Sequence, residues 1–111
     1  MSNGFSSFQK DLPKDLTNIT VVELFGTKAR LKIIHTLSME PNYELNISDI
    51  TRKTQQNHKR VSNEISFLKK IGIIQEKKYG RIRILRLKEE RYKVKFLIDF
   101  LESWESQRQS K

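Results

Sequence analysis

Between positions 57 and 87 the apolar residues change from a helical to an alternating spacing. The residues that share one face of the predicted helix, three or four positions apart, are Val61, Ile65 and Leu68. Asn57 is a favoured N-cap, and Gly72 suits the left-handed position that follows many helix ends. We therefore expect an amphipathic helix over 57–71.

Two short apolar segments follow this helix and predict a β-hairpin. Residues 73–77 and 81–87 are rich in Ile and Leu, and Gly80 supplies the backbone angles of a tight turn over 78–80. Leu85 breaks the strict alternation of the second strand, so its far end is expected to be covered on both faces. The residues expected to point inward, between Arg81, Arg83 and Arg86, are Ile82, Ile84 and a third candidate, Leu87.

The rest of the chain predicts further helices around this segment. Thr17 or Asn18 can cap the first of them, and Thr27 can cap the second. The expected helices cover 18–25, 28–39, 48–54 and 89–105, and a short strand is expected at 43–46. We divide the chain into a flexible arm (1–15), a helix-turn-helix domain with its hairpin (16–88), a C-terminal helix (89–105) and a tail (106–111). Phe5 and Phe8 in the arm either stay solvated or pack on the domain or a partner.

The charge is concentrated in the same part of the chain. Of 111 residues, 22 are Lys or Arg and 13 are Asp or Glu, which gives a net charge of +9. Residues 52–95 hold 15 of the basic residues and only 4 of the acidic ones. A clustered basic surface attracts polyanions because binding releases their condensed counterions. The clustering therefore favours nucleic acid as the partner over a surface that is charged only for solubility.

Composition narrows the remaining possibilities. A chain of this length with 36% hydrophobic residues has room for one domain with a modest core. It has no Cys, which excludes disulfides and thiolate metal sites and fits the reducing cytoplasm. No apolar run approaches the roughly 20 residues that span a bilayer, and no signal peptide is recognisable. No phosphate loop, ligand cluster or nucleophile set stands out, so we expect neither an enzyme nor a cofactor. The isolated carboxylates, expected to be solvated or paired with Lys or Arg, are Asp49, Glu64 and Glu76.

The helix over 48–54, a turn and the helix over 57–71 together predict a helix-turn-helix, whose second helix enters the major groove of duplex DNA. Side chains on the polar face of that helix suit base reading, since Asn pairs with adenine and Lys or Arg with guanine. The expected base-reading residues are Lys59, Ser62, Asn63 and Ser66. The expected backbone contacts are Asn57, His58, Arg60, Lys70, Lys77, Lys78, Tyr79, Arg81 and Arg83, the last five of them on the hairpin, which rests on phosphates or in the minor groove. Tyr79 either packs or donates a hydrogen bond to a phosphate.

The stretches FGTKARLKIIHTL, ISDITRKT, VSNEISFLKKIGII and YGRIRILRL together resemble the winged helix-turn-helix of the ArsR-type transcriptional regulators. The resemblance covers roughly residues 20–100. It implies an α+β, mostly α fold, in which the hairpin is the wing and the last helix serves dimerisation. It departs from the metal sensors of that type, because Cys is absent and the only His residues are His35 and His58. We expect a structural role for His35, a surface role or a phosphate contact for His58, and no metal site.

The last predicted helix is apolar over a wide arc, whereas a helix that docks on one small core needs a single stripe. The surplus predicts a homodimer, in which two recognition helices meet half-sites about one DNA turn apart. The alternative is a terminal helix that the N-terminal arm buries within its own domain. The expected interface residues are Tyr92, Phe96, Leu97, Phe100, Leu101 and Trp104.

The leading hypothesis is a dimeric, cytoplasmic, sequence-specific binder of double-stranded DNA that represses transcription by occlusion. Two alternatives stay open. One is a plasmid-partition or DNA-organising protein that spreads cooperatively along DNA. The other is a winged-helix adaptor between proteins, in which the aromatic residues form the binding surface.

Overall fold

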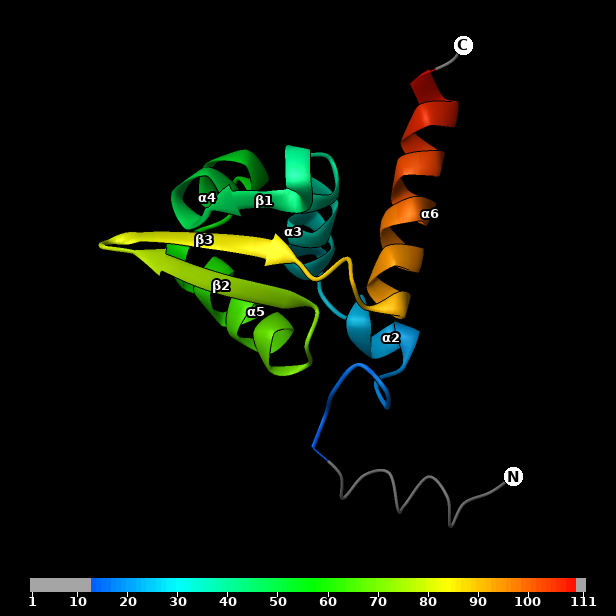
Figure 1. Ribbon diagram of the computed structural model, residues 1–111, viewed down its shortest axis with the longest axis horizontal. Coiled ribbons are helices and arrows are strands. Elements are labelled where there is room, and N and C mark those ends of the chain that lie inside the picture. The colour runs from blue at the N-terminus through cyan, green and yellow to red at the C-terminus, as the bar shows by residue number, and fades with distance from the viewer. Residues whose placement is uncertain (1–12, 110–111) are drawn as a thin grey trace.

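A computed structural model describes residues 13–109 of the chain. The elements in order are α2 (Val21–Leu24), α3 (Lys28–Ser38), the 3-10 turn η1 (Pro41–Tyr43), β1 (Glu44–Asn46), α4 (Ile47–Thr54), α5 (His58–Lys70), β2 (Ile74–Tyr79), β3 (Ile82–Leu87) and α6 (Tyr92–Gln109). In Figure 1 the hairpin of β2 and β3 reaches out on one side, and α6 stands on the opposite side with α2 at its foot. The architecture is the predicted winged helix-turn-helix, α+β and mostly α.

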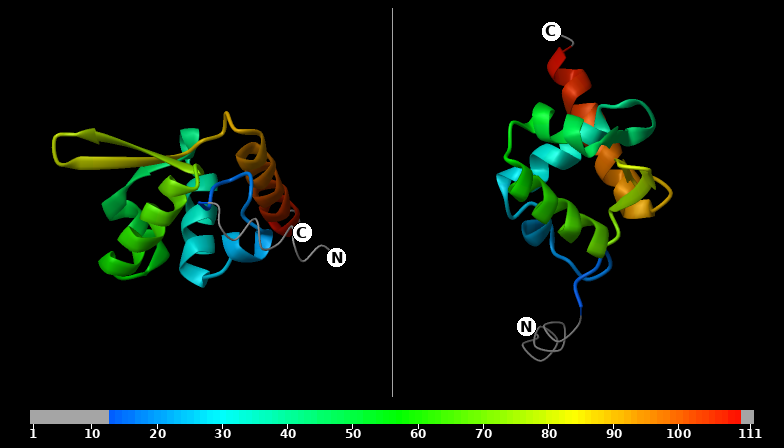
Figure 2. Two further views of the ribbon diagram at one scale, coloured as in Figure 1. Left: turned by 90° about the horizontal axis from the view of Figure 1, so that it is seen from below. Right: turned by 90° about the vertical axis from the view of Figure 1, so that its left-hand side faces the viewer.

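The sheet has three antiparallel strands in the order β1-β3-β2, so β3 is the central strand. The helices pack on one face of this sheet, and its other face is open, as the left view of Figure 2 shows. Direct partners in the register point to the same face. Ile74 pairs with Leu87 and Glu76 with Leu85, and these side chains face the helices.

This register corrects the predicted alternation of β3. Leu85 and Leu87 are fully buried, whereas Ile82 is 55% exposed on the open face and Ile84 is half-buried beside it. Both frames of the strand contain apolar residues and an arginine, so local alternation could not decide between them. The turn was predicted over 78–80 but consists of Gly80 and Arg81, because Tyr79 still pairs with Ile82.

The main helices begin and end for the expected reasons. Thr27 caps α3 and Asn57 caps α5, each accepting a hydrogen bond from a backbone amide of the first turn. After α5, Gly72 has a φ of 89°, and a Cβ there would also collide with the guanidinium of Arg91. The helices and their cap residues pack around a core whose fully buried side chains include Ile33, Ile34, Leu37, Ile50, Val61, Ile65, Leu68, Ile71, Ile73 and Ile98.

Three predicted helix boundaries were wrong. The first helix begins at Val21, because Thr20 and Glu23 form a capping box, while Asn18 instead accepts a hydrogen bond from the backbone of Asp15. Helix α4 begins at Ile47, one residue earlier than predicted, because Asn46 is its N-cap. Helix α6 spans 92–109 in place of 89–105, since residues 89 and 90 lie in a turn before it.

Candidate nucleic-acid interface

Helix α5 separates an apolar face from a polar one. Val61, Ile65 and Leu68 are fully buried against the core, as the spacing predicted. On the opposite face Lys59, Asn63, Ser66 and Lys70 are exposed, and Ser62 is half-buried. The exposed side chains include donors and acceptors of the kinds that read base edges. The right view of Figure 2 shows α5 along its length, with the end of the hairpin beside it.

Three residues near the start of α5 differ in which side-chain donors and acceptors remain available to a ligand. The side-chain oxygen of Asn57 accepts a hydrogen bond from the Arg60 amide at 2.7 Å, so this oxygen is occupied by the cap. His58 is exposed. The guanidinium of Arg60 is 53% exposed and lies 3.9 Å from the carboxylate of Glu64, which leaves most of its donors available to an anion.

Glu64, expected to be solvated or paired with Lys or Arg, is paired with Arg30 and lies on the buried face of α5. Its Oε1 accepts a hydrogen bond from Arg30 Nε at 2.7 Å, and its Oε2 accepts one from the hydroxyl of Thr27 at 2.9 Å. The Arg30 guanidinium also stacks on Phe67, 4.0 Å from the ring centroid, and donates to the carbonyl oxygen of Glu23. A buried carboxylate is tolerated only with such partners. The pair therefore fixes α5 on α3. Glu64 follows the buried Val61 by three residues, and this spacing was the sign in the sequence that Glu64 lies on the buried face.

Glu76 joins the wing to α5. Its side chain is 5% exposed, Oε1 accepts from Lys69 Nζ at 2.6 Å, and Oε2 accepts from Arg83 Nε at 2.6 Å. The hydrogen bond from Arg83, helped by the one from Lys69, lowers the pKa of this carboxyl to about 2. The bridge runs from the end of α5 through β2 to β3. The charge of Arg83, an expected backbone contact, is thus compensated within the domain.

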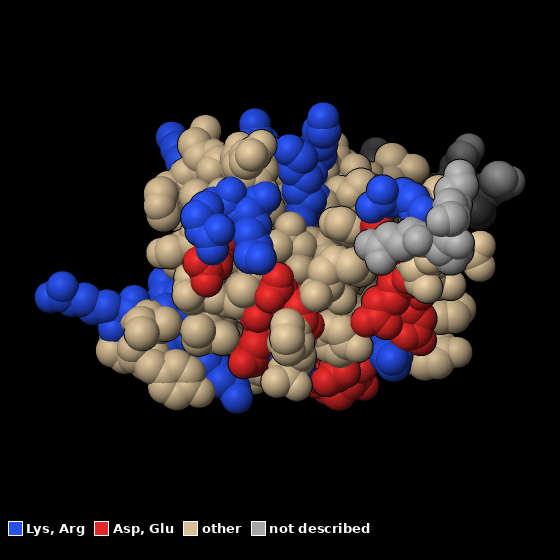
Figure 3. All heavy atoms as spheres, turned by 90° about the horizontal axis from the view of Figure 1, so that it is seen from above, with Lys and Arg blue, Asp and Glu red and all other residues tan. Residues whose placement is uncertain are grey.

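The cations at the end of the wing are arranged differently. Lys77, Lys78 and Arg81 are exposed, and Tyr79 between them is 62% exposed. Within residues 13–109 none of these three cations has a carboxylate within 4.0 Å. In Figure 3 basic atoms mark the projecting end of the molecule, and the acidic atoms in that view lie back from it. The wing tip is therefore a concentrated, uncompensated positive charge.

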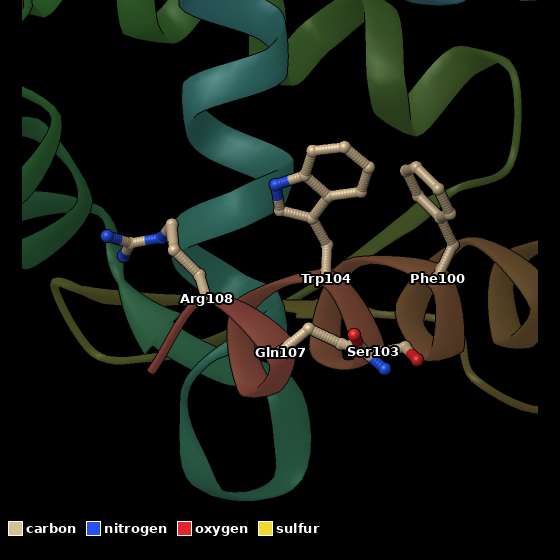
Figure 4. A pocket seen from close by; sticks show the side chains of 5 residues that line it. All are labelled: Phe100, Ser103, Trp104, Gln107 and Arg108. Carbon is tan, nitrogen blue, oxygen red and sulfur yellow. The ribbon is translucent and has the colours of Figure 1, made fainter. Parts of the chain in front are cut away.

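A second exposed surface lies on α6. Tyr92, Phe96, Phe100 and Trp104 follow one another at every fourth residue and are 57–82% exposed. The ring centroids of Tyr92 and Phe96 are 5.9 Å apart, and those of Phe100 and Trp104 are 6.0 Å apart. In Figure 4 Phe100 and Trp104 project from the same side of the helix, and Ser103 and Gln107 lie on another side.

The aromatic row on α6 borders a groove toward α2. The groove has a volume of about 880 Å³, and its lining includes Val21, Phe96 and Phe100. Val21 and Val22 on α2 are 65% and 77% exposed. Of the interface residues expected from the sequence, Leu97 is half-buried and Leu101 belongs to the core of its own chain, because it is only 8% exposed.

The other expectations concern metals, carboxylates and membranes. His35 Nε2 lies 3.0 Å from the carboxylate of Glu105, which fits the structural role expected of it. Asp49 is paired with Arg52 at 2.8 Å. Among residues 13–109 no group of three His, Cys, Asp or Glu side chains is placed to hold a metal ion. No helix in that range is long and apolar enough to cross a membrane.

Several solved structures share this fold at low sequence identity. No protein-family model and no curated protein sequence matches the chain. HlyU from Vibrio cholerae is 15% identical, with a TM-score of 0.65 over 94% of this chain and 97% of its own. The transcriptional repressor BigR from Xylella fastidiosa is 14% identical, with a TM-score of 0.64 over 93% and 95%. An ArsR-family transcriptional regulator is 23% identical, with a TM-score of 0.52 over 73% and 82%. The chain therefore has the winged helix-turn-helix fold of these proteins, and its resemblance to the ArsR type holds at the level of the fold.

Proposed function

We propose that this protein binds double-stranded DNA sequence-specifically as a homodimer and regulates transcription, acting as a repressor that occludes its site. The observation that carries the proposal is the pairing of two surfaces on one side of the molecule. These are the exposed polar face of α5 and the uncompensated cations of the wing tip; α5 and the wing are neighbouring elements in Figure 2. A helix of this kind fits the major groove, and such a tip fits the adjacent backbone or minor groove.

The residues divide by role within this proposal. Phosphate contacts hold a protein in register, whereas contacts to base edges carry sequence information. The proposed base-reading residues are Lys59, Ser62, Asn63 and Ser66. The proposed backbone contacts are Asn57 through its free amide group, His58, Arg60, Lys70, Lys77, Lys78, Tyr79 and Arg81. Arg83 is left out because its guanidinium is held by Glu76, whose single negative charge it shares with Lys69.

The proposed dimer uses the aromatic row of α6 together with the exposed valines of α2. Single exposed apolar residues are common on protein surfaces, but four exposed rings in a row beside an apolar groove form a contiguous nonpolar patch. Such patches mark interaction sites. The most economical partner is the same surface of a second copy, related by a two-fold axis. Such a dimer would present two α5 helices to half-sites about 34 Å apart along the DNA. Of the three structural neighbours named above, BigR is described as a transcriptional repressor and the ArsR-family protein as a transcriptional regulator, which supports the regulatory role.

Selection of bound sequences from a pool of random duplexes tests the proposal. We expect a recovered site that is roughly palindromic and a footprint with sharp ends. Equal affinity for the recovered site and for random duplex at 150 mM salt would refute sequence specificity. A footprint that spreads along the DNA would favour a DNA-organising protein, and no duplex binding at low salt would favour an adaptor.

Two variants separate the recognition of bases from the contacts to the DNA backbone. Asn63→Ala should lose about 1–3 kcal/mol of discrimination at one base pair while binding random duplex as before. Arg81→Ala should weaken all duplexes alike and reduce the salt dependence of binding. Lys95→Ala is the matched control, because it removes a cation from α6, which lies across the molecule from the wing.

A further inference from the structure

Two apolar side chains lie side by side at the tip of the wing. Tyr79 and Ile82 are direct cross-strand partners, the last pair before the turn of Gly80 and Arg81. They point to the open face of the sheet and are 62% and 55% exposed. Neither residue belongs to the core or to the half-buried side chains that pack against it. The folded domain therefore gains little from their apolar character.

An exposed apolar pair is unfavourable at the free end of a hairpin. Exposed apolar residues at the free end of a hairpin favour association with other chains, and natural sheets usually place charged residues there. Single exposed apolar residues are common on proteins, but these two form a joint patch on an element that projects from the body. The space around Gly80 is also open, with no atom within 4 Å of a Cβ built there. Aromatic and β-branched residues favour a strand, but no contact with the core accounts for the apolar character of this pair.

The surroundings of the pair identify the kind of partner. Lys77, Lys78 and Arg81 frame it and have no carboxylate partners among residues 13–109. The partner must therefore combine negative charge with a nonpolar surface. The minor groove of DNA is about 6 Å wide and is bordered by phosphates, and its walls are the nonpolar faces of the deoxyriboses. It attracts arginine where it is narrow, and proteins commonly place apolar side chains in it.

We propose that the Tyr79–Ile82 pair is a nonpolar contact of the wing with the deoxyribose walls of the minor groove, beside Arg81. The inference rests on the proposed DNA binding and deepens it. The cations supply attraction that depends on salt, and the apolar pair supplies attraction that does not. The pair would also make the wing sensitive to what fills the floor of the groove, because G·C pairs place an amino group there and A·T pairs do not.

A salt titration with the duplex recovered by selection separates the two contributions. Ile82→Ser should weaken binding about 5-fold to 10-fold at every salt concentration and leave the slope of log K against log salt unchanged. Arg81→Ala should instead reduce that slope by about one. Met39→Ser is the matched control, since it removes an exposed apolar residue at the end of α3, outside the wing, α5 and the proposed dimer surface, and should leave affinity within twofold. All three variants should melt like the wild type, because none of these side chains is buried.

Base substitution locates the contact in the groove. At A·T pairs that flank the half-sites, replacement by G·C should weaken wild-type binding, whereas replacement by inosine·cytosine should not, because inosine lacks the amino group. In the Tyr79→Ser/Ile82→Ser double variant the difference between A·T and G·C flanks should disappear. An unchanged affinity of Ile82→Ser, a G·C penalty that survives in the double variant, or an equal penalty from inosine would each overturn the inference while DNA binding stands. If the wild type binds no duplex, both the inference and the proposed function fail.

Discussion

Replacing Glu76 by Gln removes one negative charge from the junction between α5 and the wing and nearly preserves the side-chain shape. The wild-type carboxylate accepts from Lys69 and Arg83 at 2.6 Å each, and its side chain is 5% exposed. In the variant both cations lose their counter-charge, but they are 43% and 35% exposed and can be hydrated. We therefore expect a folded protein whose wing is held less firmly on α5.

The magnitude follows from the pKa of Glu76. Its value of about 2, against an ordinary 4.5, corresponds to roughly 3 kcal/mol at 1.36 kcal/mol per pH unit. Water screens partners that are as exposed as Lys69 and Arg83, so we expect a loss of about 1–2 kcal/mol in the free energy of unfolding at pH 7. For a domain of this size that corresponds to a fall in Tm of roughly 5–15 °C.

The loss should depend on pH in a defined direction. Folding lowers the pKa of Glu76, so its stabilisation is complete above pH 4.5 and is lost as the pH falls toward 2. Urea unfolding followed by circular dichroism, at one fixed protein concentration, should show the full difference between wild type and Glu76→Gln at pH 7. At pH 3 the difference should be less than half as large, because the unfolded wild type is then mostly protonated.

Glu90→Gln is the matched control, since Glu90 pairs with Arg86 at 3.1 Å but is 56% exposed. It should change stability by no more than about 0.5 kcal/mol. The reasoning would be refuted if Glu76→Gln were as mild as this control. It would also be refuted if the loss persisted unchanged at pH 3, because the cause would then be packing and not charge.

Three further variants test other parts of the structure. Arg30→Met should lower the free energy of unfolding by about 3–5 kcal/mol in urea titrations, because it leaves Glu64 buried without the guanidinium that hydrogen-bonds to it; a loss below 1 kcal/mol would contradict this. Asn57→Ala should cost about 1 kcal/mol in the same assay through loss of the cap on α5, and an unchanged midpoint would speak against it. Trp104→Glu should convert the proposed dimer into a monomer in sedimentation velocity without lowering the helix content, whereas Arg108→Ala should not.

The fold could be predicted where one periodicity dominated. The spacing of Val61, Ile65 and Leu68 gave the buried face of α5, and the caps at Thr27 and Asn57 gave the starts of two helices. The wing alternation failed because both frames of β3 carry apolar residues. The pairing with β2 decides which residues of β3 face the helices. Ile74 faces the helices and pairs with Leu87, so Leu87 and Leu85, two residues apart, face them as well.

The sequence predicted the roles of the charged residues less well than those of the apolar residues. The sequence shows the basic cluster but not which cations are already compensated, so Arg83 and Arg81 looked equivalent. The difference depends on Glu76, which lies opposite Leu85 in the register and within reach of both Arg83 and the end of α5. The capping box of Thr20 and Glu23 was readable in advance and would have placed the start of α2 correctly.

The short strand β1 has a consequence for how the chain folds. Asn46 pairs with Ile84 and is also the N-cap of α4, so the strand passes into the helix without a linker. This pairing closes a loop that contains α4, α5 and most of the hairpin. Closing a loop of this length costs entropy before its contacts form, whereas the hairpin, with its two-residue turn, is a local structure. We therefore expect the hairpin to form early and the β1–β3 pairing to complete the domain late, as the step that commits both helices to one arrangement.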